Sequence, residues 1–319
     1  VEACRRTLAI VEAPELYHNL GNALHRIPGR NAEALAAFQR AVELDPTNWK
    51  SKHMLSLLRD EDMDSIPANF VEGLFDEYAS YYERDVIEKL RYRVPGLIRR
   101  YLLKAVPGRT RFASVLDLGC GTGSLTVTLT GDDRAVVGID PAEAMLAAAR
   151  ARPGGDGVEW RHGDAGLIAP DSADLVVMSG NVAMHLVDDD WHASLRRIGA
   201  GLVPGGRLVF ETRNPVRRAW EGWQQDPTER TMPAGRVLES ERTSAPDRHG
   251  VVTMRVRTEF LDSGEVSEVD QHLQFRSAEQ VRADLAAAGL RVERLSGDWH
   301  RTAFDPAEHP LMVVEAVRD

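Results

Sequence analysis

The amino-acid sequence predicts an α/β fold, a doubly wound sheet preceded by an all-α helical segment. Two observations carry this prediction. From Phe112 onward, apolar segments typical of buried strands alternate with helical segments. Ahead of them, residues 15–48 place their apolar side chains at helical spacing. A chain of 319 residues is long enough for one sizeable domain and a smaller one.

A helical hairpin is predicted over residues 15–48. One helix runs from Glu15 to Ile27 and the next from Asn31 to Leu44, with a break at Pro28 and Gly29. The hairpin resembles a tetratricopeptide repeat in the residues Leu20, Gly21, Ala34, Phe38, Ala41 and Pro46. Because residues 2–14 and 49–58 resemble halves of neighbouring repeats, we expect helical repeats over residues 1–59. Such repeats could dock a peptide or a second copy, or only pack against the rest of the chain.

The second domain is expected over residues 69–319, because the polar, proline-ended segment before it predicts a linker at residues 60–68. Strands are predicted at Ser114–Leu118, Ala135–Ile139, Val158–Arg161, Asp174–Met178 and Arg207–Phe210. Helices are clearest at Ala142–Arg150 and Trp191–Leu202. At Ser124–Thr130 only the position predicts a helix, since threonine and valine are poor helix formers.

The stretch of about residues 220–275 is too long for a simple connection. Within it, Val251–Phe260 and Val266–Phe275 alternate polar and apolar residues, which predicts a β-hairpin. Ser277 and Gln280 then form the capping box of a following helix. Two last strands are predicted at Arg291–Leu295 and Leu311–Val317.

The strongest chemical signal is a glycine-rich turn directly after the first predicted strand. Gly119, Gly121 and Gly123 suit a backbone with positive φ or one that lies against a ligand. A dinucleotide-binding loop would need its third glycine where the chain has Ser124. Asp117, just before the turn, would repel a pyrophosphate and can instead face a ligand ammonium. A nucleotide-dependent oxidoreductase is therefore the less favoured interpretation.

The stretch from Val115 to Ser124 resembles motif I of the class I S-adenosylmethionine-dependent methyltransferases. Residues 75–83 resemble the N-terminal helix that many small-molecule methyltransferases fold over their cofactor. With the helical segment upstream, the whole chain resembles bacterial methyltransferases that carry tetratricopeptide repeats. The resemblance implies a Rossmann-like sheet of seven strands with antiparallel edge strands, the cofactor S-adenosylmethionine, and an enzyme that transfers its methyl group.

The resemblance places cofactor contacts at several points along the chain. Asp140, at the end of the second strand, can accept both ribose hydroxyls, although such an acid can also be a surface turn residue. Met145 can cover the adenine or belong to the core, and Asp164 resembles the residue that reads the adenine amine. The expected cofactor residues are Tyr78, Tyr82, Asp117, Gly119, Cys120, Gly121, Gly123, Asp140, Pro141, Met145, Asp164, Ala165, Ser179 and Asn181.

Methyl transfer needs mainly in-line alignment of the acceptor and the methyl group in a site that excludes water. A general base is needed only where the acceptor must lose a proton. His185, just after the fourth predicted strand, is the best-placed base, with a structural histidine as the equal alternative. Because parallel strands end at one edge of a sheet, His185, Glu211 and Arg213 are expected at the acceptor. No spacing of histidines and carboxylates resembles a metal-ligand set, so no metal is expected.

The amino-acid composition makes some classes of binding partner less favoured than others. A net charge of −10 disfavours nucleic acid and anionic membrane surfaces. The two cysteines, Cys4 and Cys120, do not suggest a disulfide framework, which favours a reducing, cytoplasmic compartment. We expect a small-molecule acceptor held under the 220–275 insertion and the helix at residues 75–82. The alternatives are a protein acceptor docked by the repeats, or an interaction protein without catalytic activity.

Overall fold

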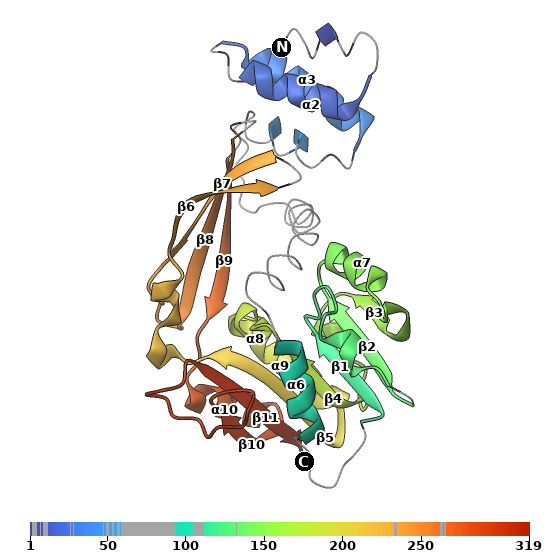
Figure 1. Cartoon of the computed structure of the whole chain (residues 1–319), viewed down its shortest axis with the longest axis vertical. Coiled ribbons are helices and arrows are strands. Elements are labelled where there is room, and N and C mark those ends of the chain that lie inside the picture. Colours follow the sequence, from blue (N-terminus) through green and yellow to red (C-terminus); the bar gives the residue numbers. More distant parts are fainter. Residues whose placement is uncertain are drawn as a thin grey trace. The chain divides into compact units, whose positions relative to one another are not determined.

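In the computed structural model, the described residues are 12–58, 94–104 and 112–319, apart from isolated positions within these ranges, with a few residues before residue 9 (Figure 1). The chain divides into two compact units, Val1–Tyr78 and Ala79–Asp319. The linker predicted at residues 60–68 and the helix predicted around Tyr78 and Tyr82 lie outside the described residues.

The N-terminal unit contains the predicted helical hairpin, made of α2 (Pro14–His25) and α3 (Asn31–Leu44). The helices approach closely at Gly21, where an added Cβ would lie 2.6 Å from the ring of Phe38. His18 is buried against the same ring, with 5.5 Å between the ring centres. A small residue on one helix thus admits a large one from the other, and the predicted N-terminal helices are confirmed.

The larger unit is built on a sheet of seven strands in the order β10-β11-β5-β4-β1-β2-β3 (Figure 1). The strands from β1 to β5 run parallel, whereas β11 pairs antiparallel with both β5 and β10. Their bounds are β1 Ser114–Leu118, β2 Ala135–Asp140, β3 Glu159–His162, β4 Ala173–Met178, β5 Leu202–Arg213, β10 Leu290–Ser296 and β11 Leu311–Arg318. Each strand predicted for this sheet is therefore present, and the antiparallel edge is confirmed.

Helices connect the strands and cover both faces of this sheet. The α-helices are α6 Val94–Lys104, α7 Glu143–Ala151, α8 Val182–His185, α9 Asp188–Gly201 and α10 Ala278–Ala287. The short 3-10 helices are η2 Thr126–Leu129, η3 Gly155–Gly157, η4 Ala165–Leu167, η5 Pro215–Arg217 and η6 Ala219–Gly222. The capping box of α10 is formed as predicted, with Ser277 and Gln280 bonding each other's backbone N–H. In the part of the chain that the structure describes, no helix combines the length and apolar character of a membrane span.

The segment after the glycine turn is the short helix η2 rather than the longer helix expected at Ser124–Thr130. Thr126 donates its hydroxyl to Asp117 at 2.7 Å, and Thr128 donates to the carbonyl of Leu125 at 2.7 Å. Side-chain hydrogen bonds of this kind compete with helical backbone bonds, and β-branched residues favour a helix weakly. The weak helix propensity of these residues therefore limits the helix to one short turn, although their position after β1 favours a longer one.

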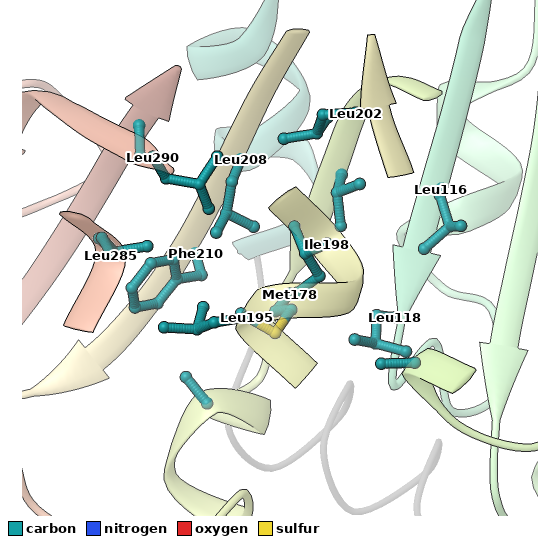
Figure 2. Packing of buried hydrophobic residues seen from close by; sticks show 14 of the residues in the cluster. Leu116, Leu118, Met178, Leu195, Ile198, Leu202, Leu208, Phe210, Leu285 and Leu290 are labelled. Atoms are coloured by element: carbon teal, nitrogen blue, oxygen red, sulfur yellow. The ribbon is translucent and has the colours of Figure 1, made fainter. Parts of the chain in front are cut away.

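Alternate residues of each strand fill two hydrophobic layers. Leu208 and Phe210 of β5 pack with α9 and α10 on one face of the sheet (Figure 2). Val209, between them, belongs to the opposite layer with Tyr101 of α6 and Trp299. Because a slip of one residue would exchange the two sets, burial on both faces fixes the strand register.

The residues between β5 and α10 form a second sheet of four antiparallel strands in the order β6-β7-β8-β9. Its strands are β6 Gln225–Met232, β7 Gly235–Thr243, β8 Val251–Phe260 and β9 Val266–Gln274. The hairpin of β8 and β9 confirms the prediction. The sequence does not reveal β6 and β7, because Pro227 interrupts β6 at a shift in its register and charged residues obscure the alternation.

An aromatic junction holds both ends of the second sheet. Trp220, ahead of β6, packs edge-on against Phe275, directly after β9, with 4.7 Å between ring centres. Met184 of α8 joins the same buried cluster with Val252 and Leu273. The chain therefore enters and leaves the second sheet at one place, next to α8.

Arg276 ties this junction to α8. Its buried guanidinium donates to the carbonyls of Ala183 at 3.1 Å and Leu186 at 2.6 Å, and lies 4.3 Å from the ring centre of Trp191. Burial lowers the pKa of Arg276 to about 10, so the side chain stays charged at neutral pH. A cation is favourable at the carbonyl end of a helix.

Candidate functional site

The candidate site lies where the winding of the seven-stranded sheet reverses. β1 pairs with β2 on one side and with β4 on the other. In doubly wound sheets, connections that leave such a point in opposite directions open a crevice at the carboxyl ends of the strands. Gly119 follows β1 and Ser179 follows β4, so the predicted turns border this crevice.

The turn after β1 is left-handed at all three glycines, with φ of 69° at Gly119, 53° at Gly121 and 73° at Gly123. An added Cβ would meet Val182 at 2.5 Å in the first case and Trp160 at 2.5 Å in the last. At Gly121 no described residue comes within 4 Å of the same position. Packing thus requires two of the glycines, while Gly121 leaves its backbone open to a ligand.

Asp140 ends β2 and holds this turn. Its Oδ2 accepts the N–H of Gly121 at 2.8 Å, and its Oδ1 accepts the N–H of Ala142 at 2.9 Å. Burial raises the pKa of Asp140, and the two backbone donors oppose the rise. Because each carboxylate oxygen can accept a further bond, two hydroxyl groups can still be accommodated.

Asp117 of β1 is completely buried. Its Oδ2 accepts a hydrogen bond from Thr126 at 2.7 Å, whereas Oδ1 has no partner in the described part of the chain. Burial raises the pKa of Asp117 to about 7, with a contribution from Asp140. Since a buried acceptor without a donor is costly, a ligand donor or a water at Oδ1 would be stabilising.

Cys120 lies in the middle of the turn and is a buried, free thiol. Burial, with the nearby carboxyls of Asp117 and Asp140, raises its pKa. The thiol is therefore protonated at neutral pH and is not a nucleophile. Its Sγ and the ring of Trp160 fill the space over Gly138, where an added Cβ would lie 3.0 Å from the sulfur and 2.6 Å from the ring.

Four of the predicted adenosine contacts lie after β2 and β3. Pro141 is exposed, and its carbonyl lies 2.8 Å from Nε2 of His162. Asp164 is also exposed, and its Oδ1 caps η4. Met145 and Ala165 are buried. For Met145, burial agrees with the alternative that it belongs to the hydrophobic core. The structure thus brings these residues near Asp140, with two at the surface and two inside.

The turn after β4 carries two consecutive left-handed residues, Gly180 with φ of 72° and Asn181 with φ of 64°. This conformation is strained at a residue other than glycine. Glu211 of β5 holds it, since its Oε1 accepts the N–H of Gly180 at 3.0 Å and that of Asn181 at 3.3 Å. Oδ1 of Asn181 is buried without a partner among the described residues. Ser179 is half-buried just before the pair.

Trp299 is a residue that the sequence analysis misses. Its indole Nε1 donates to Oε2 of Glu211 at 2.6 Å, and its ring packs edge-on against Tyr101 with 5.1 Å between centres. Tyr101 in turn donates its hydroxyl to Glu315. Glu211, expected at the acceptor, therefore uses both oxygens within the protein. In the sequence, the one indication of such a role is that Trp299 is a tryptophan in the mostly polar loop after β10.

Arg213 and His185 are the remaining predicted acceptor residues. Arg213 ends β5, and its Nε is buried without a hydrogen-bond partner in the described part of the chain. His185 ends α8, and part of its side chain reaches the surface while the rest is enclosed by the protein. The surrounding protein lowers the pKa of His185 by desolvation, so the imidazole is neutral at pH 7 and can accept a proton. Over the described residues, no group of three His, Cys, Asp or Glu side chains could hold a metal ion.

Known proteins resemble this chain in the same region. Residues 115–206 match the family model described as a methyltransferase domain. An uncharacterized methyltransferase of Bacillus cytotoxicus is 32% identical over 140 residues, which cover 43% of this chain and 65% of that protein. A Bacillus mycoides relative matches to the same extent. The chain thus spans slightly less than two thirds of the curated relatives that it matches.

Solved structures share the fold. A S-adenosylmethionine-dependent methyltransferase from Clostridium acetobutylicum aligns with a TM-score of 0.62 and 15% identity, over 75% of this chain and 98% of that one. The sugar N-methyltransferase KedS8 from Streptoalloteichus aligns with a TM-score of 0.51 and 22% identity, over 70% of this chain and 86% of that one. The seven-stranded sheet therefore has the fold of these methyltransferase structures.

Proposed function

We propose that this protein is an S-adenosylmethionine-dependent methyltransferase that methylates a small molecule by in-line displacement. One observation carries the proposal: the open backbone of Gly121 is held by Asp140, an acid that keeps acceptor capacity for hydroxyl groups. This pair lies at the reversal point of the sheet, where such folds bind their ligands. The methyltransferase-domain match at residues 115–206 supports the same conclusion.

In this proposal the cofactor, when bound, supplies a methyl group already activated on a sulfonium centre. The residues of the chain then bind and orient it. Asp140 accepts the ribose hydroxyls, and Asp164 accepts the adenine amine. The unpartnered Oδ1 of Asp117 faces the ammonium group, directly or through a water. Tyr78 and Tyr82 remain predicted contacts from the N-terminal helix.

The acceptor side is formed in this proposal by the turn after β4 and by α8. Ser179 and Asn181 border the point where the methyl group is transferred. His185, neutral at pH 7 because desolvation lowers its pKa, takes the proton from an acceptor that must lose one. We propose that the second sheet covers the acceptor, since its aromatic junction packs on Met184 of α8, one residue before His185.

The N-terminal helices belong to the proposal as tetratricopeptide-type repeats. The close packing of Gly21 against Phe38 supports this assignment, because small residues let paired helices approach in such repeats. A protein acceptor or partner docked on these helices stays the alternative to a small-molecule acceptor. The free, buried thiol of Cys120 is consistent with a reducing, cytoplasmic compartment.

The proposal is tested by titrating the protein with S-adenosylhomocysteine and, separately, with NAD in a calorimeter. We expect binding of S-adenosylhomocysteine and none of NAD. Binding of NAD alone would overturn the proposal in favour of a nucleotide-dependent oxidoreductase. Binding of neither would favour the interaction protein without catalytic activity.

A further inference from the structure

We infer that Arg213 binds an oxyanion of the acceptor, so that the acceptors of this enzyme are carboxylic or phosphoric acids. The inference deepens the proposed function and rests on it. The side chain of Arg213 is permanently charged, and its Nε is buried without a hydrogen-bond partner among the described residues.

The position of Arg213 is that of an acceptor contact. It is the last residue of β5, at the carboxyl edge of the sheet. Side chains two residues apart on a strand share a face, so Arg213 lies on the same face as Glu211. That face borders the turn after β4, because Glu211 accepts the N–H groups of Gly180 and Asn181.

No acid of the described chain neutralises Arg213. The nearest carboxylate along its strand, Glu211, already accepts three N–H groups, two from the β4 turn and one from Trp299. The next arginine, Arg217, donates to the carbonyl of Ala307 at 2.7 Å. Leaving a buried donor of a charged group unpaired is unfavourable, so a ligand oxyanion at the Nε of Arg213 removes a cost that the described residues do not remove.

The chemistry of the guanidinium selects the ligand. Its Nε and terminal N–H groups form a planar fork that matches two oxygens of a carboxylate or phosphate. Asn181, on the neighbouring turn, has the complementary deficiency, because its buried Oδ1 lacks a donor. An acid that also carries a hydroxyl or amine group satisfies both residues, and that hydroxyl or amine is the group to be methylated.

The cofactor itself contains a carboxylate, so a test must separate the two sources of the oxyanion. The protein is first saturated with S-adenosylhomocysteine, and then titrated with matched pairs of small molecules. Salicylate is compared with salicylamide, and phosphoethanolamine with ethanolamine. The variants are Arg213→Gln and, as a matched control from the same edge of the sheet, Arg217→Gln.

We expect the wild type and Arg217→Gln to bind at least one acid about tenfold more tightly than its neutral partner, since hydrogen bonds to charged groups are strong. Arg213→Gln is expected to lose this preference and to bind S-adenosylhomocysteine as tightly as the wild type. If Arg213→Gln weakens S-adenosylhomocysteine instead, the arginine holds the cofactor carboxylate and the inference is wrong. It is also wrong if the wild type does not prefer acids. Absence of S-adenosylhomocysteine binding to the wild type would contradict the proposed function itself.

Discussion

The indole nitrogen of Trp299 lies 2.6 Å from Oε2 of Glu211, and the other oxygen of this carboxylate holds the strained turn at Gly180 and Asn181. A loop near the C-terminus thereby sets the backbone after β4. Trp299 is itself fixed by its edge-on packing against Tyr101 of α6. The proposed acceptor side of the site therefore depends on contacts that lie outside it.

Replacing Trp299 by Phe should remove the hydrogen bond and keep most of the ring packing. We expect a loss of about 1 kcal/mol in the free energy of unfolding, measured by urea denaturation. Because the turn would be held less firmly, turnover should fall more than the apparent affinity for S-adenosylmethionine. Trp223→Phe, which alters a ring packed on Phe275, is the control. An unchanged ratio of kcat to KM in Trp299→Phe would show that the bond does not position the turn.

Asp140→Asn disturbs the turn less than alanine does, because asparagine keeps one acceptor oxygen for the N–H groups of Gly121 and Ala142, whereas alanine removes both bonds. We expect S-adenosylhomocysteine to bind at least about tenfold more weakly, and the free energy of unfolding to fall by about 1–3 kcal/mol because one backbone N–H loses its acceptor. Isothermal titration calorimetry measures the affinity. Glu143→Gln, at the start of the adjacent helix and paired with Arg150 on the surface, should bind as the wild type does. Equal affinity of Asp140→Asn would remove Asp140 from the site.

The buried carboxyl of Asp117 makes stability depend on pH. Its pKa rises from an ordinary 3.8 to about 7 through burial, so between these values the folded protein keeps a proton that the unfolded chain has released. The contribution to the free energy of unfolding is fully present below the ordinary pKa and is lost as the pH rises towards 7, at up to about 1.4 kcal/mol per pH unit.

Urea denaturation across this window should therefore show a steeper loss of stability with rising pH in the wild type than in Asp117→Asn. The substitution keeps an oxygen for the hydroxyl of Thr126. The exposed Asp156→Asn should retain the slope of the wild type. Parallel slopes for wild type and Asp117→Asn would mean that Asp117 is ionised throughout.

Arg276→Met should destabilise the junction between α8 and the second sheet. The substitution leaves the buried carbonyl of Ala183 and the half-buried carbonyl of Leu186 without their donor, which costs about 2–3 kcal/mol. Arg255→Met removes an exposed ion pair with Asp270 and should cost less than about 1 kcal/mol. Similar unfolding free energies for the two variants, measured by urea denaturation, would contradict the structural role of Arg276.

His185→Gln tests the general base. Where the acceptor must lose a proton, turnover should fall about a hundredfold or more, while S-adenosylhomocysteine binds unchanged. Since desolvation lowers the pKa of His185, the rate of the wild type should rise with pH to an inflection below 6.5 and stay flat above it. The exposed His192→Gln serves as the control. A wild-type rate that still rises above pH 7 would exclude His185 as the base.

The sequence predicts the seven-stranded sheet well because its central strands, such as β1 and β4, are buried on both faces. The bounds predicted for β1 are those observed, and β2 and β4 differ from prediction by one residue. Continuous apolar runs and the glycine turn are local signals, which is why the positions of Gly121 after β1 and of Asp140 at the end of β2 follow from the sequence. The role of Asp140 towards the cofactor stays a prediction implied by the resemblance.

The acceptor side could not be predicted to the same degree, because it depends on tertiary contacts. Glu211 looks like a crevice residue until Trp299, far along the chain, is seen to occupy one of its oxygens. The strands β6 and β7 carry charged residues on a sheet with little core behind it, so their alternation is weak. Thr126 shortens the helix after the glycine turn through a bond to Asp117, a contact that no local pattern encodes.

The edge-on pair of Trp220 and Phe275 joins the entry and the exit of the four-stranded sheet. A segment attached at one point can be lengthened, shortened or exchanged during evolution without shifting the pairing of β5 with β11. Substitutions on the surface of the four-stranded sheet then have little effect on the folding of the seven-stranded sheet and its helices. Under the proposed function, the second sheet can change the acceptor specificity in this way while the residues proposed to bind the methyl donor stay unchanged.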